Sequence, residues 1–327
     1  MTLRKLLFVA LAIWGIPALA DGNLQGGLDA EKKRDFVGAL AAFQPLAIDG
    51  NAEAQYHMGL LYIDGVSRDM NLAVRWLEDS ANQGYAPAQT RLGTIYVRGD
   101  GVMPDMGKGV DWIKKAAAQG FADAQVSLGV IYWNYLRPPD FIQAAFWFGK
   151  AAEQGDARGE SGLGAFYMRG WGVPKDVSKA VYWNRKAAEQ GYPDAEGSLG
   201  LAYQYGSGVP KDYSLAIYWY RKGAAHGNLR SILSLGAFYA NGWGVPKDYV
   251  VSLALFDLSV DKLIRTDRLA ADDAAMNQRI LLKLVSEEQI MEGKSLAADM
   301  QRGGILPTLD SYILQHHQSS DGGEVEH

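Results

Sequence analysis

The sequence predicts an all-α fold, a solenoid of about six two-helix repeats with a helical cap at each end. The first observation is a column of glycines that close the repeats, spaced 34 to 36 residues apart. The second is a pair of aromatic columns with the same period, one of tyrosine and one of tryptophan. The closing glycines are Gly50, Gly84, Gly120, Gly155, Gly191 and Gly227; the tyrosines are Tyr62, Tyr96, Tyr132, Tyr167, Tyr203 and Tyr239; the tryptophans are Trp76, Trp112, Trp147, Trp183 and Trp219. A period of this length indicates a repeat array rather than two globular domains.

Each repeat is predicted to hold two helices, because apolar residues recur at helical spacing in both of its halves. The halves are separated by loops such as Gly170–Lys175, which are rich in glycine and proline. An aspartate follows each loop, where it can cap the second helix or complement the helix dipole. These aspartates are Asp69, Asp105, Asp140, Asp176, Asp212 and Asp248. Two loops depart from the pattern, at 63–66 and 133–139, so the curvature is expected to change there.

Small residues within each first helix predict close packing of helix backbones. One column is Ala54, Ala88, Ala124, Gly159, Ala195 and Ser231; a second is Gly59, Gly93, Gly129, Gly164, Gly200 and Gly236. A glycine inside a helix costs about 1 kcal/mol relative to alanine, so its recurrence indicates a packing role. The tyrosine and tryptophan columns are expected to fill the space between repeats, since each large ring buries on the order of 150–250 Å².

The ends of the chain lose the repeat pattern. Residues 21–50 are predicted to hold a linker and an N-terminal capping helix, and residues 51–262 the repeat array. Residues 263–314 are predicted to form a C-terminal helical cap, in which Ser286 and Gln289 have the spacing of a capping box. The polar residues 315–327 are expected to be a disordered tail.

The first 20 residues have the layout of a cleavable signal peptide. Arg4 and Lys5 precede the apolar run Leu6–Ile16, and cleavage is expected after Ala20. The run is too short to cross a bilayer, which needs about 20 apolar residues in a helix, so no integral membrane span is expected in the mature chain. The predicted location is therefore periplasmic or extracellular.

Charge and cysteine content exclude several kinds of site. The formal net charge is −5, and no basic run is longer than Lys32–Arg34, so nucleic acid is not an expected partner. The chain has no cysteine, which excludes disulfide bonds, thiolate metal sites and a thiol nucleophile.

The repeat pattern resembles the SEL-one-like repeat family, relatives of the tetratricopeptide repeats. The pattern is Ala-x4-Gly-x2-Tyr, then Gly-x-Gly-Val-Pro-Lys-Asp, then Ala-x2-Trp and a closing glycine, seen clearly at 206–212 and 180–191. The resemblance covers about residues 35–260. It implies a right-handed α/α superhelix with a concave binding surface, and a C-terminal helical cap of the kind seen in the family.

No motif predicts catalysis, a cofactor or a metal site. None of the five histidines forms an H-E-x-x-H pair. Ser259–Lys262 matches S-x-x-K in isolation, and Gly101–Gly109 fails the P-loop pattern because it lacks the required Ser or Thr. Some cysteine-rich members of the resembled family are linked to β-lactam binding, yet this chain has none of their cysteines.

A binding face is predicted from the helical projection of each first helix, at the sixth, tenth, thirteenth and fourteenth residues after the closing glycine. The candidate partner-binding residues are Tyr56, Ile63, Val97, Arg98, Trp133, Asn134, Met168, Arg169, Leu201 and Tyr205. The alternative is that adjacent first helices cover much of this face. Trp171 and Trp243, in equivalent loops, are expected to pack on their own repeats rather than act as exposed anchors.

The main functional hypothesis is an exported adaptor that binds a protein or peptide partner in envelope assembly, signalling or host interaction. The alternative is a carbohydrate or peptidoglycan binding module, since aromatic residues are abundant. A β-lactam-directed enzyme is the least favoured hypothesis, because no catalytic constellation is present. The pattern carries no information on oligomeric state.

Overall fold

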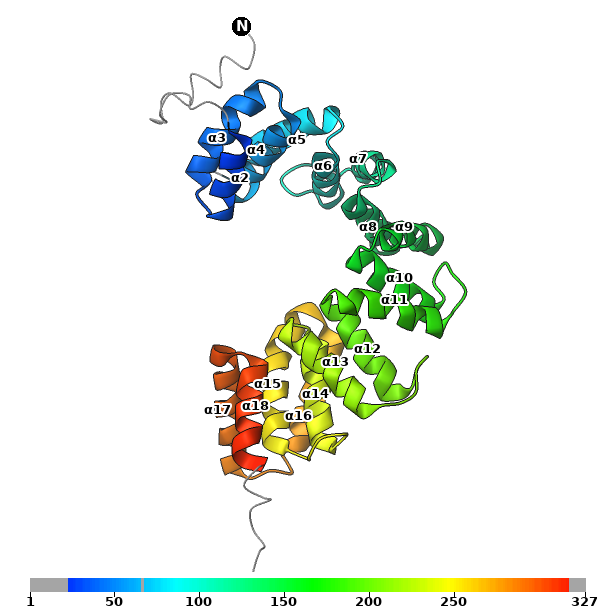
Figure 1. The fold of residues 1–327 in the computed structure, drawn as a ribbon, viewed down its shortest axis with the longest axis vertical. Helices are drawn as coiled ribbons and strands as arrows, with labels where there is room; N and C mark the ends of the chain where they lie inside the picture. The colour runs from blue at the N-terminus through cyan, green and yellow to red at the C-terminus, as the bar shows by residue number, and fades with distance from the viewer. Residues whose placement is uncertain (1–22, 66–67, 318–327) are drawn as a thin grey trace, which may run out of the picture. The chain divides into compact units, whose positions relative to one another are not determined.

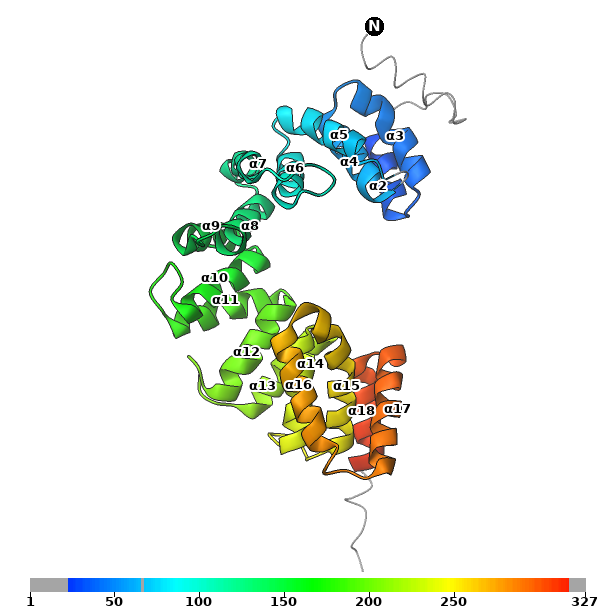
Figure 2. The same ribbon diagram turned by 180° about the vertical axis from the view of Figure 1, so that it is seen from behind.

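A computed structural model describes residues 23–65 and 68–317 of the chain. Every regular element in these ranges is helical, which confirms the predicted all-α class (Figures 1 and 2). The predicted signal peptide and the last residues of the predicted tail lie outside the described residues. The chain divides into two compact units, Met1–Gln154 and Gly155–His327, which are described separately.

The N-terminal unit is a succession of antiparallel helix pairs in which each helix packs on the next one in sequence. Its helices are α2 (Leu24–Lys32), α3 (Phe36–Ile48), α4 (Ala52–Leu60), α5 (Met70–Asn82), α6 (Ala86–Arg98), α7 (Met106–Ala118), α8 (Ala122–Val130) and α9 (Phe141–Glu153). Two helices, α2 and α3, lie in the segment where the sequence predicted one capping helix.

The C-terminal unit holds three further helix pairs, followed by three helices in the segment where the sequence predicted a C-terminal cap. Its helices are α10 (Ala157–Arg169), α11 (Val177–Glu189), α12 (Pro193–Tyr205), α13 (Tyr213–Ala225), α14 (Leu229–Asn241), α15 (Tyr249–Thr266), α16 (Arg268–Leu281), α17 (Glu287–Gly303) and α18 (Ile305–His317). The long helix α15 packs against α14, α16 and α17, and α18 packs against α17 and α13. Ser286 and Gln289 form the expected capping box at the start of α17.

The helix ends follow the predicted chemistry. Each loop aspartate caps its helix by accepting a backbone N–H. The closing glycines all have φ between +80° and +96°, a conformation that favours glycine. In the two repeats with departing loops, the first helices end in π-helical turns, η1 (Leu61–Gly65) and η2 (Ile131–Tyr135), which were not predicted.

The mid-helix glycines make room for one large side chain from the second helix of the same repeat. The side chains that meet them are Leu77, Ile113, Phe148, Asn184, Tyr220 and Phe256. A Cβ atom on any of these glycines would lie only 2.4 to 2.9 Å from the facing side chain. The six side chains are buried, whereas the tryptophans one residue earlier are only half-buried. The residue after each tryptophan therefore fills the space beside the glycine within its own repeat, while Trp76, Trp112, Trp147 and Trp219 pack, partly buried, against the apolar cores.

Lysines cover part of the exposed indole surface. Lys115 Nζ lies 3.9 Å from the Trp112 ring centre, and the corresponding distances are 5.0 Å for Lys186 on Trp183 and 5.1 Å for Lys222 on Trp219. These are cation–π contacts between residues three apart on one helix face. The tryptophan side chains are thus half-buried, and in three repeats a lysine three residues later lies over the ring.

A buried polar column, which was not predicted from the sequence, links successive helices of the N-terminal unit. The Gln89 amide donates to the Ala81 carbonyl at the end of α5 (3.0 Å), and its oxygen accepts from Gln119 (2.8 Å). Gln55 and Gln125 make the equivalent pairs of bonds. The bonds from Gln55, Gln89 and Gln125 add a second donor to helix C-terminal carbonyls that already accept the N–H of the closing glycine.

In the C-terminal unit the same column is acidic. Glu160 and Glu196 are fully buried. Glu160 contacts Lys186 Nζ at 3.1 Å and accepts from the Gln190 amide at 2.8 Å. Glu196 lies 3.9 Å from Lys222 Nζ and 2.8 Å from His226 Nδ1. A carboxylate cannot donate a hydrogen bond to a helix carbonyl, so these two repeats lack the bond that glutamine makes in the N-terminal unit. Their glutamates form ion pairs with lysine instead.

Substitution of Gly200 by alanine tests the role of the glycine column. Gly200→Ala should lower the free energy of unfolding by about 1–3 kcal/mol, because the new Cβ would lie 2.4 Å from the Tyr220 ring. Gly149→Ala is the matched control, since a Cβ at this helical position meets no atom within 4 Å. It should stabilise the protein by about 0.5–1 kcal/mol. Urea unfolding of both variants measures the difference, and equal effects would contradict the packing role.

Substitution of Glu196 by glutamine tests the acidic column. Glu196→Gln should raise the free energy of unfolding at pH 8 by about 1 kcal/mol, because the amide can donate to the Ala188 carbonyl as Gln89 does to Ala81. Glu189→Gln removes an exposed charge from α11 and controls for net charge. A loss of stability specific to Glu196→Gln would show that the contacts to Lys222 and His226 outweigh the lost cap.

Candidate binding groove

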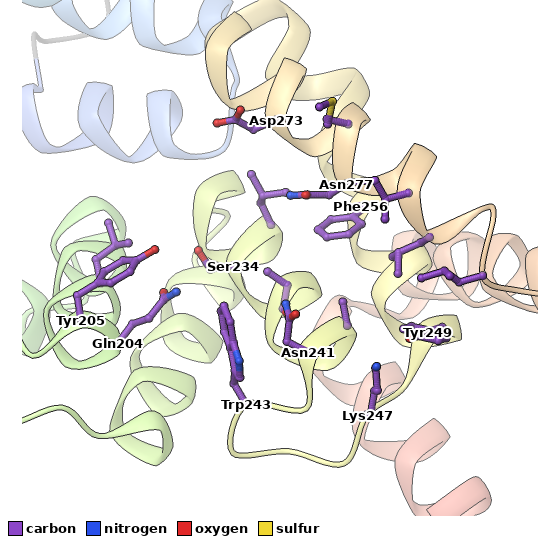
Figure 3. A pocket seen from close by; sticks show the side chains of 18 residues that line it. Gln204, Tyr205, Ser234, Asn241, Trp243, Lys247, Tyr249, Phe256, Asp273 and Asn277 are labelled. Carbon is purple, nitrogen blue, oxygen red and sulfur yellow. The ribbon is translucent and has the colours of Figure 1, made fainter.

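A groove of about 740 Å³ opens between α12, α14 and α16 of the C-terminal unit (Figure 3). Helix α14 lies between the other two, because it packs against both. Helix α12 supplies one wall with Leu201, Gln204 and Tyr205. The opposite wall consists of residues of α16 and of the turn after it, namely Asp273, Met276, Asn277, Ile280, Leu281 and Leu284. The floor is formed by α14 and includes Leu233, Ser234, Ala237, Ala240 and Asn241. The volume is in the range of ligand-binding sites.

The groove is deep because small residues on α14 lie between large ones on its neighbours. Ser234, Ala237 and Ala240 have short side chains, so they fill little of the space above α14. On the walls, Tyr205 is 68% exposed and Met276 is 63% exposed. Leu201, Ile280 and Leu284 are also exposed. Exposed apolar side chains gathered on the walls of one groove are a feature of interaction sites.

A buried polar network fixes the α12 wall. The Tyr220 hydroxyl donates to the Gln204 side-chain oxygen at 2.6 Å and is hydrogen-bonded to Ser234. Burial raises the pKa of Tyr220 far above its usual value, so the hydroxyl keeps its proton. Because the Gln204 oxygen is held in this way, the Gln204 amide group faces the groove (Figure 3).

The two ends of the groove carry opposite charges. Asp273 lies at one end and Lys247 at the other, as Figure 3 shows. Neither has an ion-pair partner among residues 23–65 and 68–317, although Lys247 Nζ lies 4.9 Å from the Tyr249 ring centre. Trp243 borders the Lys247 end and packs on Phe238 and Tyr213. The walls of the groove therefore combine apolar and polar side chains, and its two ends carry opposite charges.

Asp267 holds α16 in place beside α14. It caps α16 by accepting the Ala270 N–H at 3.3 Å, and its other oxygen accepts from Arg230 Nε of α14 at 2.7 Å. The Arg230 guanidinium, and then the Ala270 N–H, lower the pKa of Asp267 below its usual value. The charged carboxylate thus joins the floor of the groove to one of its walls.

The structure brings two of the predicted site residues together, because Leu201 and Tyr205 line one wall of the groove. In the same unit, Met168 is half-buried, and the Arg169 guanidinium carbon lies 4.5 Å from the Trp171 ring centre. Trp171 packs edge-on against Phe166 with 5.7 Å between ring centres. The packing expected for Trp171, and for Trp243 above, is thereby confirmed.

The predicted residues of the N-terminal unit differ in exposure. Arg98, Trp133 and Asn134 are exposed, and Tyr56 is half-buried with its ring centre 5.5 Å from that of Tyr85. Ile63 and Val97 are buried, so their assignment to an open face needs correction.

Close helix approaches explain both buried positions. Val97 is covered by α7, whose Gly109 lets the helices approach so closely that a Cβ there would lie 2.7 Å from Val97 Cγ2. Ile63 belongs to the π-helical turn η1 and packs in the same apolar core as Leu77.

Several groove residues were missed by the sequence reasoning. Asp273, Met276 and Ile280 lie in α16, beyond the repeat columns from which the binding face was projected. Their signal was present as apolar residues four apart at Met276, Ile280 and Leu284, a spacing that predicts one helix face. Lys247 belongs to a loop column that was interpreted only as a helix boundary.

Two other kinds of feature were searched for in the described part of the chain. Within residues 23–65 and 68–317, no group of three or more His, Asp or Glu side chains has a geometry suited to a metal ion. None of the helices in these ranges combines the length and apolar character needed to span a membrane.

Comparison with known proteins gives consistent matches. The model of the Sel1 repeat family matches residues 52–85, 86–121, 122–156, 157–192, 193–228 and 230–262. A protective antigen present in uropathogenic Escherichia coli strains, which displays an SLR fold, is similar at 30% identity and a TM-score of 0.76, over 90% of this chain and 63% of the antigen. A Sel1 repeat protein from Oxalobacter formigenes is similar at 32% identity and a TM-score of 0.61, over 68% of this chain and 90% of that one. This chain thus spans less than two thirds of the antigen. No curated protein matches.

Removal of the Asp267 carboxylate tests how α16 is held. Asp267→Ala should lower stability by about 1 kcal/mol at pH 7, because α16 loses its N-cap and its bond to Arg230. The folded-state pKa is lowered, so this stabilisation is present above the usual pKa of about 3.9 and is lost as the pH falls through the lower folded value. Urea unfolding between pH 7 and pH 2 should show the wild type converging on the variant. Asp272→Ala, an exposed change in the same helix, should show no such convergence.

Proposed function

Because the chain belongs to the Sel1 repeat family, whose members generally act as protein-interaction scaffolds, we propose that it is a non-catalytic scaffold that binds a protein or peptide partner in the groove of α12, α14 and α16. The observation that carries the proposal is the set of exposed apolar side chains on the two groove walls. Complete burial of one such side chain contributes about 1.5–3 kcal/mol. Three of them would thus supply about 5–9 kcal/mol towards the cost of association.

The polar groups of the groove support binding of a specific partner rather than nonspecific hydrophobic association. Gln204 is oriented by Tyr220, and the opposite charges of Asp273 and Lys247 give the groove a direction. A few placed polar groups in an apolar site are what fixes the orientation of a bound molecule. The remaining predicted residues are proposed as further contact positions within their own units: Arg98, Trp133, Asn134 and Arg169, which are exposed, and Tyr56 and Met168, which are half-buried.

The proposal includes export of the protein. The leader-like residues 1–20 support a periplasmic or extracellular location, with cleavage after Ala20. A role in envelope assembly, signalling or host interaction follows from such a location. Similarity to a protective antigen of uropathogenic Escherichia coli supports host interaction among these three.

Carbohydrate or peptidoglycan binding is the weaker candidate. Sugars stack on open aromatic faces, and Tyr182 and Tyr218 are exposed on α11 and α13. The neighbouring rings of Trp183 and Trp219 are instead covered by Lys186 and Lys222, which a sugar would have to displace. A β-lactam-directed enzyme has the least support, since the groove contains no nucleophile beside a base.

Charged substitutions in one groove wall test the proposal. Met276→Asp with Ile280→Asp should lower partner recovery from envelope extract about tenfold or more, because two apolar contacts are replaced by buried charges. The matched control is Tyr182→Asp, which alters a similarly exposed residue of α11 outside the groove. Quantitative mass spectrometry of crosslinked complexes measures recovery, and circular dichroism verifies folding. Equal recovery by wild type and the groove variant would reject the groove as the binding site.

A further inference from the structure

We propose that the groove accepts an amphipathic α-helix of a partner protein, seated along α14 with its N-terminus towards Asp273 and its C-terminus towards Lys247. This inference rests on the proposed scaffold function and adds the conformation and direction of the bound segment. Three features of the groove lead to it, namely its cross-section, its shortage of backbone partners and its two unpaired charges.

The cross-section of the groove fits a helix. Helices α12 and α16 flank α14, so their axes are about two interhelical distances apart, on the order of 16–20 Å. A helix with its side chains is about 10–12 Å across. The floor residues Ser234, Ala237 and Ala240 are small enough for such a helix to approach α14 closely. The long side chains of Tyr205 and Met276 would then cover its two flanks.

The groove offers few hydrogen-bonding partners for an extended backbone. An extended segment leaves its N–H and C=O groups unpaired unless a strand edge or side chains bind them. Residues 23–65 and 68–317 contain no strand, and the polar side chains of the groove, such as Gln204, Ser234 and Asn277, are separated by apolar ones. The Asn241 amide is already used by the Ala237 carbonyl at 2.8 Å. A helix satisfies its own backbone, so it loses least when it enters this groove.

The walls set the length and register of the bound helix. The α16 wall runs from Asp273 through Met276 and Ile280 to Leu284, a path on the order of 15 Å at 1.5 Å per helical residue. The partner helix should therefore have about three turns in contact. Apolar side chains at positions i, i+3 or i+4, and i+7 would fit between the wall residues. One polar side chain among them would accept from the Gln204 amide.

The unpaired charges set the direction. A helix carries a partial positive charge at its N-terminus and a partial negative charge at its C-terminus. Asp273 and Lys247 lie at opposite ends of the groove (Figure 3), and neither is neutralised by a described residue. The favourable arrangement places the helix N-terminus beside Asp273 and the C-terminus beside Lys247. Groove-facing charges of the partner should follow the same order, basic first and acidic last.

A random library of 15-residue displayed peptides, selected on the purified full chain, tests the proposal. Enriched peptides should carry apolar residues at i, i+3 or i+4, and i+7, lack internal proline and carry basic residues before acidic ones. Transferred nuclear Overhauser effects on the best synthetic peptide should show a helix in the bound state. Selection on the charge-reversed variant Asp273→Lys with Lys247→Glu should reverse the charge order, and the wild-type peptide should bind that variant about tenfold or more weakly.

The other outcomes separate the two proposals. Peptides that alternate apolar residues at i and i+2, bind in an extended form and are lost on Met276→Asp would overturn the helix while keeping the groove. Peptides that bind Met276→Asp as well as wild type, or no enriched peptide at all, would overturn both. Concentration-dependent dimerisation in the ultracentrifuge that Met276→Asp abolishes and peptide fails to displace would assign the groove to a second copy and overturn the proposal.

Discussion

The structure depends on one close contact that recurs in every repeat, where a glycine in the middle of the first helix receives a large side chain from the second. In the repeat of α12 and α13 the pair is Gly200 and Tyr220. A helical glycine costs about 1 kcal/mol, and the buried side chain offsets that cost. The contact uses one face of the first helix, and in α12 part of another face, with Leu201 and Tyr205, stays exposed. Tyr220 also links the two roles, because its ring packs on Gly200 while its hydroxyl orients Gln204 in the groove.

Features that depend on local rules could be predicted from the sequence. Aspartate caps, left-handed closing glycines and the capping box at Ser286 each involve residues within a few positions of one another, and all are present as expected. The shorter loop after Tyr62 and the loop without glycines after Tyr132 each follow a first helix that ends in a π-helical turn. Because the sequence pattern recurs with a strict period, the same local rules could be applied to each repeat in turn. The six matches to the Sel1 repeat show that this period was interpreted correctly.

Features that depend on contacts between distant residues were missed. The core position after tryptophan and the buried column of Gln89, Glu160 and Glu196 require knowledge of which faces meet. Helical projection places Val97 on a free face, but the approach of Gly109 buries it. Two residues of the α12 wall could be predicted, since Leu201 and Tyr205 obey the projection. The other wall belongs to α16, which lies outside the repeats and reaches the groove only because α15 is long and α16 packs back on α14.

The central claim, that this C-terminal groove is where a partner binds, is tested most directly by site-specific photocrosslinking in living cells. A benzoylphenylalanine at position 276 on the α16 wall should form a crosslink to a partner protein, whereas the same group at position 182 on the exposed face of α11 should not. Crosslinks from position 182 with none from position 276 would contradict the account.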